Sequence, residues 1–272
     1  MKLGSAFLWT TAVGLSAAQN YTRCATPNPP EAQAGELDAL VAEDGSSLAS
    51  LLAQAATVRT YVHVVTSTSR QGRLLTIKQA MNRAYSDMGF TFSLMSTDFA
   101  VNNQWAASSL GSSAERAMKT ALKRGSYGEL DLYFTTDIPN RILGWCYFPV
   151  ANPSSSELVL DGCVNLADSI PGGTAAPFNL GATAVHEIGH WLGLFHVWNG
   201  NSCSGAGDQV ADTPIQSTPS YGCDVGKDTC PGGGVDNINN WMDYSDDACM
   251  DRFTAGQTSR ATTLFNQLRS GR

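Results

Sequence analysis

The chain of 272 residues has few histidines and few basic residues, and it has no long apolar run after its first residues. It contains only four histidines, and its 17 lysines and arginines are outnumbered by 24 aspartates and glutamates. An acidic chain without basic clusters is poorly suited to bind nucleic acid, so we expect no such partner. Beyond the N-terminus no run reaches the roughly 20 apolar residues that a membrane helix needs, and we expect no membrane anchor.

Residues 1–18 have the pattern of a secretory signal. Lys2 precedes an apolar stretch from Ala6 to Leu15, and the small residues Ser16 and Ala18 stand before a plausible cut. We therefore expect the mature protein to be secreted and extracellular.

Residues 19–52 are rich in alanine, proline and glutamate and show no clear strand, so they are predicted to be a leader or propeptide. The catalytic domain is predicted to follow as residues 53–272. Asn20-Tyr-Thr forms a glycosylation sequon, which makes Asn20 a candidate glycosylation site in a secreted protein.

Three of the four histidines lie in residues 186–196, His-Glu-Ile-Gly-His-Trp-Leu-Gly-Leu-Phe-His. His186 and His190 are four residues apart, so on a helix they project from one face and can bind one Zn²⁺. Gly193 tolerates a positive φ and lets the chain turn back, which allows His196 to become the third ligand. Three protein ligands leave one position open for water, and this open position is typical of a catalytic zinc.

Glu187 follows the first of these histidines, where its carboxylate can face a zinc-bound water without becoming a ligand. This placement predicts a general base for hydrolysis. The other interpretation is an ordinary amphipathic helix, and the two further fixed positions, Gly193 and His196, argue against it. The fourth histidine, His63, lies in an apolar run and is expected in the core or on a sheet face.

Strands and helices alternate along the chain, which predicts an α/β fold with a twisted mixed sheet backed by helices. An upper subdomain should extend to about residue 196, with an irregular lower subdomain over residues 197–272. Substrate is expected between the two, adding as an extended strand to a sheet edge. The predicted strands are Thr57–Thr66, Phe90–Met95, Leu130–Thr135 and two around Gly144–Val150 and Leu158–Leu166, and the predicted helices are Leu75–Met88, Ala114–Arg124, Leu180–Leu192 and Phe253–Ser270, the last with Thr254 as N-cap.

The zinc motif together with Asn240-Trp-Met-Asp-Tyr resembles the metzincin metalloproteases, which pair a long zinc-helix motif with a methionine-containing turn. Gly181-Ala-Thr-Ala-Val-His and Val210-Ala-Asp-Thr-Pro are similar to the pappalysin or ulilysin-like branch, which includes secreted extracellular metalloproteases. The resemblance covers roughly residues 58–265 and is densest from Gly181 to Thr254. It implies a metzincin-like catalytic domain that binds one Zn²⁺ and cleaves proteins and peptides.

The resemblance also implies roles for residues outside the zinc helix. Met242 should form an apolar floor beneath the histidines. Tyr244 should lie near the zinc and donate a hydrogen bond to the tetrahedral oxyanion. Related enzymes bind Ca²⁺ near the loop that carries Asp208, Asp212 and Thr213, so these oxygens form a candidate calcium site.

Some relatives cut before basic residues by means of an acid beyond the methionine-containing turn. Asp246 and Asp247 lie close to that place, but the residue directly before Cys249 is Ala248. We therefore do not extend this preference to the present chain.

Seven cysteines indicate an oxidising compartment. Six of them lie from Cys146 onward, and spacing alone leaves their connectivity open. The resemblance favours two interlocked bridges that would staple the loop-rich lower subdomain, and the remaining two cysteines, which flank a predicted hairpin, should pair. The expected bridges are Cys203–Cys230, Cys223–Cys249 and Cys146–Cys163.

Cys24 is the odd cysteine, and two interpretations of it stay open. It is either an unpaired or intermolecular thiol in the leader, or a latency switch whose thiolate fills the open zinc position until the leader is cut away. Several metzincins, including pro-forms in this branch, use such a switch.

The sequence thus predicts a secreted, monomeric zinc endopeptidase. The alternative is a catalytically silent secreted binding protein on the same fold, which should have lost Glu187 or a histidine, and neither is lost. A structural zinc protein would need a fourth protein ligand near His196, and none is obvious there.

Overall fold

The computed structural model describes residues 21–52, 56–68 and 77–272. The predicted signal of residues 1–18 and the sequon at Asn20 lie outside the described residues. Within the described part, no helix is both long and apolar enough to cross a membrane.

A five-stranded mixed sheet forms the centre of the fold, in the order β2-β1-β3-β5-β4. Only β4 is antiparallel to its neighbour, and the other three pairings are parallel. The central strand β3 is buried at every residue, as expected for a strand that is covered on both faces. The strands are β1 (Ala56–Thr66), β2 (Phe90–Val101), β3 (Leu130–Thr135), β4 (Gly144–Trp145) and β5 (Cys163–Leu166).

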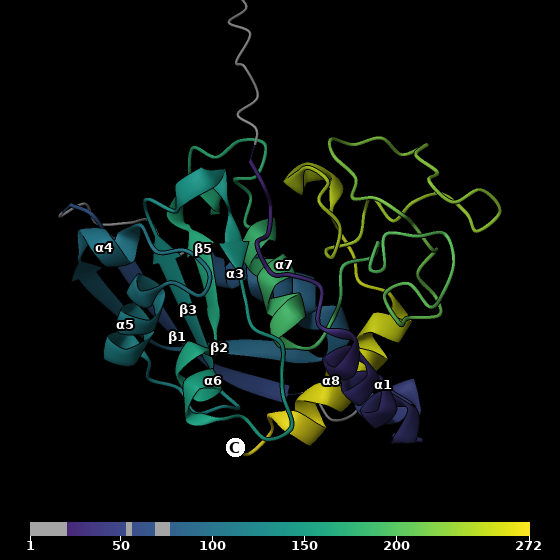
Figure 1. The fold of residues 1–272 in the computed structure, drawn as a ribbon, viewed down its shortest axis with the longest axis horizontal. Coiled ribbons are helices and arrows are strands. Elements are labelled where there is room, and N and C mark those ends of the chain that lie inside the picture. The colour runs from purple at the N-terminus through teal and green to yellow at the C-terminus, as the bar shows by residue number, and fades with distance from the viewer. Residues whose placement is uncertain (1–20, 53–55, 69–76) are drawn as a thin grey trace, which may run out of the picture.

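Helices cover both faces of this sheet (Figure 1). Helices α3 (Ile77–Tyr85) and α7 (Ala182–Trp191) pack on one face, in a core with Phe92 and Phe134. On the other face, α4 (Asn103–Ala106) and α5 (Ser113–Leu122) pack around Tyr133. The α/β class and the mixed sheet backed by helices are therefore as predicted, and of the two predicted backing helices one, α3, lies on one face and the other, α5, on the opposite face. Short 3₁₀ helices occupy Ser86–Met88, Pro139–Arg141, Ala167–Ser169 and Asp247–Cys249.

The prediction of two strands around residues 144–150 and 158–166 was wrong in part. Strand β4 ends at Trp145, and Ser155–Leu160 form a helix, α6, so that β5 begins only at Cys163. The cause is a capping box: the Ser154 hydroxyl accepts from the backbone N–H of Glu157, whose carboxylate accepts from the Ser154 N–H. Such a box satisfies backbone N–H groups at a helix start and favours a helix over the short apolar run that follows.

The leader contains two helices, α1 (Glu31–Glu43) and α2 (Leu48–Leu52), which were not predicted. Helix α1 lies against the C-terminal helix α8 (Ala255–Leu268) (Figure 1). Leu37 is buried there in a cluster with Leu264 and Leu268, and Asp38 forms an ion pair of 2.7 Å with Arg260. The leader is therefore packed onto the rest of the chain.

The region between α7 and α8 has almost no regular secondary structure. The bridges Cys203–Cys230 and Cys223–Cys249 link its loops, and Cys146–Cys163 joins the segment after β4 to β5. Helix α8 then begins at the predicted N-cap, where the Thr254 hydroxyl accepts from the Gln257 N–H. We use the name catalytic body for residues 56–272, which contain the predicted catalytic residues, and the name leader for residues 19–52, which are predicted to be one.

Candidate active site

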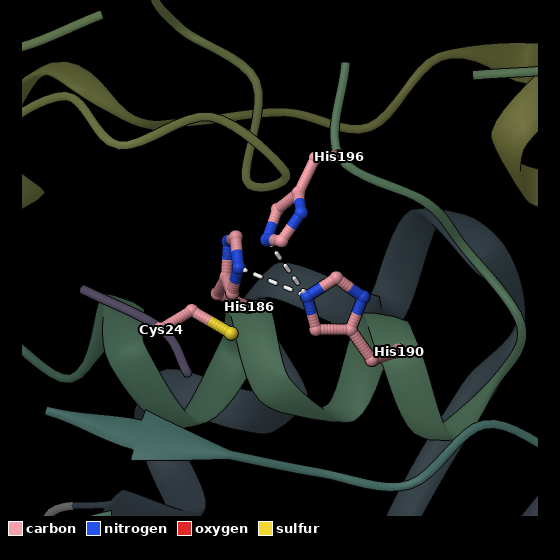
Figure 2. Close-up of side chains that lie close together, drawn as sticks. All are labelled: Cys24, His186, His190 and His196. Atoms are coloured by element: carbon pink, nitrogen blue, oxygen red, sulfur yellow. Dashed lines mark hydrogen bonds between the residues drawn. The ribbon is translucent and has the colours of Figure 1, made fainter. Parts of the chain in front are cut away.

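Helix α7 carries the first two histidines of the zinc motif, and every residue of this helix is buried. The chain leaves the helix through Gly193, which has a φ of 91°. A side chain at this position would also collide with Leu264, so a glycine is required for two reasons. The turn brings His196 back, and Nε2 of His190 lies 3.1 Å from Nε2 of both His186 and His196 (Figure 2).

The other ring nitrogen of each histidine has a hydrogen-bond acceptor. Nδ1 of His186 lies 2.8 Å from the backbone oxygen of Trp241, and Nδ1 of His190 lies 2.8 Å from that of Leu194. Nδ1 of His196 lies 3.3 Å from Oδ1 of Asn28, a leader residue. Acceptors at Nδ1 leave the Nε2 lone pairs free for a metal, which is how proteins orient metal-binding imidazoles.

Burial also keeps these imidazoles neutral. It lowers the pKa of His190 to about 4, and burial together with the neighbouring imidazoles lowers the pKa of His186 and His196 well below the usual value. A neutral imidazole is the form that binds a metal ion.

Cys24 completes a cluster of four possible metal ligands. One ligand atom from each of Cys24, His186, His190 and His196 lies within 4.8 Å of the others, and Figure 2 shows the sulfur directed toward the imidazoles. This is the one such group of three or more His, Cys, Asp or Glu residues among those described. We call it the four-residue cluster. Its donors fit zinc, because neutral imidazole and thiolate are preferred zinc ligands.

The leader reaches the cluster by adding to the sheet beside β4, and it runs parallel to that strand. The Thr22 N–H donates to Arg141 (3.0 Å), the Leu143 N–H donates to Thr22 (2.9 Å), and the Ala25 N–H donates to Gly144 (2.8 Å). These backbone bonds fix the register that places Cys24 at the histidines.

Glu187 lies beside the cluster with its carboxylate buried. Its Oε2 accepts from the Cys24 thiol (3.3 Å) and from the Thr26 hydroxyl (3.2 Å). Burial raises the pKa of Glu187 to about 8. A Cβ at Gly144 would come 3.0 Å from Cγ of Glu187, so a glycine in β4 lets the edge strand approach this carboxylate closely. Sequence reasoning missed both Thr26 and Gly144.

The methionine-containing turn lies against α7. Met242 is fully buried, and a side chain at Gly189 would collide with its sulfur. The Tyr244 hydroxyl donates to the backbone oxygen of Cys24 (3.1 Å) and lies 3.4 Å from Nε2 of His196. The structure therefore places Tyr244 beside His196 and Met242 against the helix that carries His186 and His190.

Arg23 and Asp247 form a buried pair that the sequence analysis missed. Nη2 of Arg23 donates to Oδ1 of Asp247 (2.8 Å) and to the backbone oxygen of Ser245 (2.5 Å), and the guanidinium stacks 4.8 Å from the Phe178 ring. Oδ2 of Asp247 accepts from the backbone N–H groups of Leu180 and Ala182 at the start of α7. Asp247 is one of the two acids beyond the methionine-containing turn that the sequence analysis considered, and its pairing with Arg23 was not predicted.

The predicted calcium residues are only partly brought together. Oδ1 of Asp208 accepts from the Thr213 hydroxyl at 2.6 Å, while its buried Oδ2 has no hydrogen-bond partner in the part of the chain described. Burial raises the pKa of Asp208 to about 7. The Asp212 carboxylate instead accepts from the Gly256 N–H at the start of α8 (2.8 Å).

His63 lies in the core, as predicted from the apolar run that contains it. It is fully buried in β1, and its Nε2 lies 2.8 Å from Oδ1 of Asp131.

Known proteins resemble this chain over most of its length. The peptidase family described as pregnancy-associated plasma protein-A matches residues 167–266. An extracellular metalloprotease of Pyricularia oryzae is 45% identical, over 97% of this chain and 96% of its own. Extracellular metalloprotease 1 of Coccidioides posadasii is 44% identical, over 94% of each chain.

Solved structures share the fold. Mature mirolysin of Tannerella forsythia, in complex with a cleaved peptide, has a TM-score of 0.66 at 25% identity, covering 80% of this chain and 96% of mirolysin. A promirolysin mutant has the same TM-score at 23% identity and covers 88% of this chain and 89% of its own.

Proposed function

The chain belongs to the pregnancy-associated plasma protein-A family of peptidases and is a zinc metalloendopeptidase, and from this premise we propose which residues carry its reaction. His186, His190 and His196 hold the zinc, and Glu187 is the general base. The observation that carries this assignment is the convergence of the three Nε2 atoms beside a buried carboxylate.

When bound, zinc supplies Lewis acidity that polarises the scissile carbonyl and makes water a stronger nucleophile. Glu187 takes a proton from the attacking water and passes it to the leaving amine. Tyr244 donates its hydroxyl hydrogen bond to the developing oxyanion, after the Cys24 carbonyl that now accepts it has left. Met242 packs beneath α7 and keeps the histidines in place.

The test of this assignment is Glu187→Gln. The variant should bind zinc as tightly as the parent and lose nearly all peptide hydrolysis, measured by metal analysis and by cleavage of casein with and without a chelator. Glu129→Gln, which alters a carboxylate paired with Arg59, is the matched control and should retain activity. Hydrolysis within a few-fold of the parent in Glu187→Gln would refute the role of the carboxylate.

We further propose that residues 19–52 are a latency leader and that Cys24 is its switch. Its sulfur would act as the fourth zinc ligand, and Arg23 and Thr26 beside it would fill neighbouring parts of the expected substrate groove between the two subdomains. In the active enzyme, residues 1–18 and the leader are removed, and residues 53–272 remain, with an upper subdomain to about residue 196. Mass spectrometry of the active secreted form should find Cys24 missing.

The protein and peptide substrates of this enzyme should carry a basic residue next to the scissile bond. Arg23 marks the place, because its guanidinium occupies a buried site closed by Asp247, directly before the residue at the histidines. Asp247→Asn should lower kcat/KM about 10²-fold for a peptide with arginine at that position, since a buried charge would lose its partner. The neighbouring Asp246→Asn serves as control and should leave the preference unchanged.

Calcium binding is proposed at Asp208 and Thr213. The support is the buried Asp208 oxygen without a partner, which a cation would satisfy. Calcium should raise the melting temperature of the parent and have less effect on Asp208→Asn, with magnesium as the comparison.

We also propose that the enzyme is secreted as a monomer. Asn20 would be glycosylated before the leader is removed. Extracellular relatives support secretion. A glycosidase-sensitive mass on the unprocessed chain, absent in Asn20→Gln, would test the glycan.

A further inference from the structure

We propose that the active enzyme has an apolar subsite, formed by Leu110, Tyr127, Tyr147, Phe148, Val150 and Leu160, that binds an apolar, proline-containing stretch of the substrate. This stretch lies on the opposite side of the scissile bond from the basic residue. The inference rests on the proposed function, because the subsite is open to substrate only after the leader has left.

The subsite is a cavity of about 380 Å³ between the leader and the catalytic body. It begins at Thr26 and Cys146, next to the active site, since the Thr26 hydroxyl also contacts Glu187. Phe148 extends it toward the zinc ligands, because its ring packs edge-on against His190 with centroids 5.2 Å apart. The cavity therefore lies next to Cys24 and the zinc-binding histidines.

The polar ends of its two tyrosines are bonded to the catalytic body. The Tyr127 hydroxyl donates to the backbone oxygen of Val150 (3.2 Å) and accepts from the Val150 N–H (2.7 Å). The Tyr147 hydroxyl donates to the buried carboxylate of Glu115 (3.0 Å). These bonds fix the rings, so they offer aromatic carbon to a ligand, and the wall is formed before substrate arrives.

The leader shows where substrate residues fall in the groove. Cys24 lies at the histidines, Arg23 lies on one side of it at Asp247, and residues from Thr26 onward lie on the other side, along the cavity. A substrate in the same groove would therefore place its basic and its apolar residues on opposite sides of the scissile bond. This holds whichever direction the substrate runs.

The leader also indicates the chemistry of the ligand. Pro27, Pro29 and Pro30 line the cavity, and Pro30, the N-cap of α1, has an extended backbone with φ of −53° and ψ of 147°. Proline-rich segments bind aromatic-lined grooves at low entropic cost. Of the two acidic residues of the lining, Asp161 is paired with Arg269, so the exposed carboxylate of Glu157 is the charge that should disfavour an acidic substrate residue here.

The test uses the active enzyme that forms from the full chain once the leader has been cleaved off. Its substrates are pairs of peptides that share one basic residue. The two peptides of a pair differ only on the other side of the scissile bond, two to six residues from the basic residue. At these positions one peptide carries proline and leucine, and the other carries aspartate. The parent should prefer the apolar peptide by about tenfold in kcat/KM. Leu160→Glu should reduce this preference to about twofold or less, because it places a charge in the cavity.

The matched control is Leu158→Glu, on the same helix α6 but exposed and outside the cavity lining, which should keep the parent's preference. Leu110→Ser is a milder second variant in case Leu160→Glu does not fold, and it should lower the preference as well. An active parent without apolar preference, or an unchanged preference in both folded variants, would overturn the subsite. A parent that cleaves no peptide, or that is active with Cys24 still attached, would instead contradict the proposed function.

Discussion

The catalytic body and the leader contribute to the same site in different ways. The body supplies the histidines from a fully buried helix and its following turn, and two of them are oriented by its own backbone carbonyls. The leader supplies Cys24 from an extended segment held by a few backbone bonds, and Asn28 as the acceptor for the third histidine. His186 and His190 thus lie on a rigid, buried helix, whereas Cys24 lies on an extended segment that we propose is removed on activation.

Among the changes to the leader, removing the Cys24 thiol should have the largest effect on the activity of the unprocessed chain. Cys24→Ser in the full, unprocessed chain should raise peptide hydrolysis by about 10²-fold or more, because the leader loses the tethered ligand that holds it at the zinc and leaves the substrate site far more often. Activity is measured on the unprocessed chain, with cleavage of the leader blocked and with a chelator as the control. An unprocessed Cys24→Ser chain as silent as the parent would show that the thiol does not maintain latency.

A smaller effect, on zinc affinity, is expected from Asn28, the second leader residue at the site. Asn28→Ala should weaken zinc binding by the unprocessed chain about tenfold, because His196 loses the acceptor that orients it. Competition with a chromogenic chelator measures this. The processed enzyme made from the variant should bind zinc as the parent does, and a difference there would point to misfolding.

The packing of α1 on the catalytic body should contribute less to latency than Cys24 does. Asp38→Asn removes the partner of Arg260, which is otherwise buried and donates to the backbone oxygen of Gly193. The unprocessed chain should then leak activity a few-fold above the parent, since the leader remains held by Leu37 and the backbone bonds beside β4. Glu36→Gln, exposed on the same helix, should not leak.

The smallest effect should be confined to the body. Thr254→Ala removes the N-cap of α8 and should lower the free energy of unfolding by about 1 kcal/mol. Chemical denaturation of the processed enzyme measures this loss. Latency should not change, because the hydrogen bonds of Thr254 are made to Gln257 and Thr258 in the first turn of α8.

Local sequence patterns predicted what depends on neighbouring residues. The zinc helix, the turn at Gly193 and the cap at Thr254 follow from helical spacing and from the conformational freedom of glycine, and all three are found in the structure. Strand β3 has its predicted bounds because Leu130, Leu132 and Phe134 alternate along a short segment that is rich in apolar and aromatic residues.

Contacts between distant parts of the chain were not predictable in this way. Arg23 and Asp247 are 224 residues apart, and nothing local indicates that they meet. Helix α1 gains its stability from packing on α8 and not from its own weak pattern. The error at α6 has another cause, since a short apolar run fits strand and helix equally, and the capping residues decide between them.

X-ray absorption at the zinc edge of the unprocessed and the processed chain tests the central claim most directly. We expect three nitrogen ligands in both forms, and one sulfur at about 2.3 Å in the unprocessed form alone. In the processed form an oxygen ligand should replace the sulfur. An unprocessed chain whose zinc has no sulfur ligand, or a processed enzyme that retains one, would contradict the account.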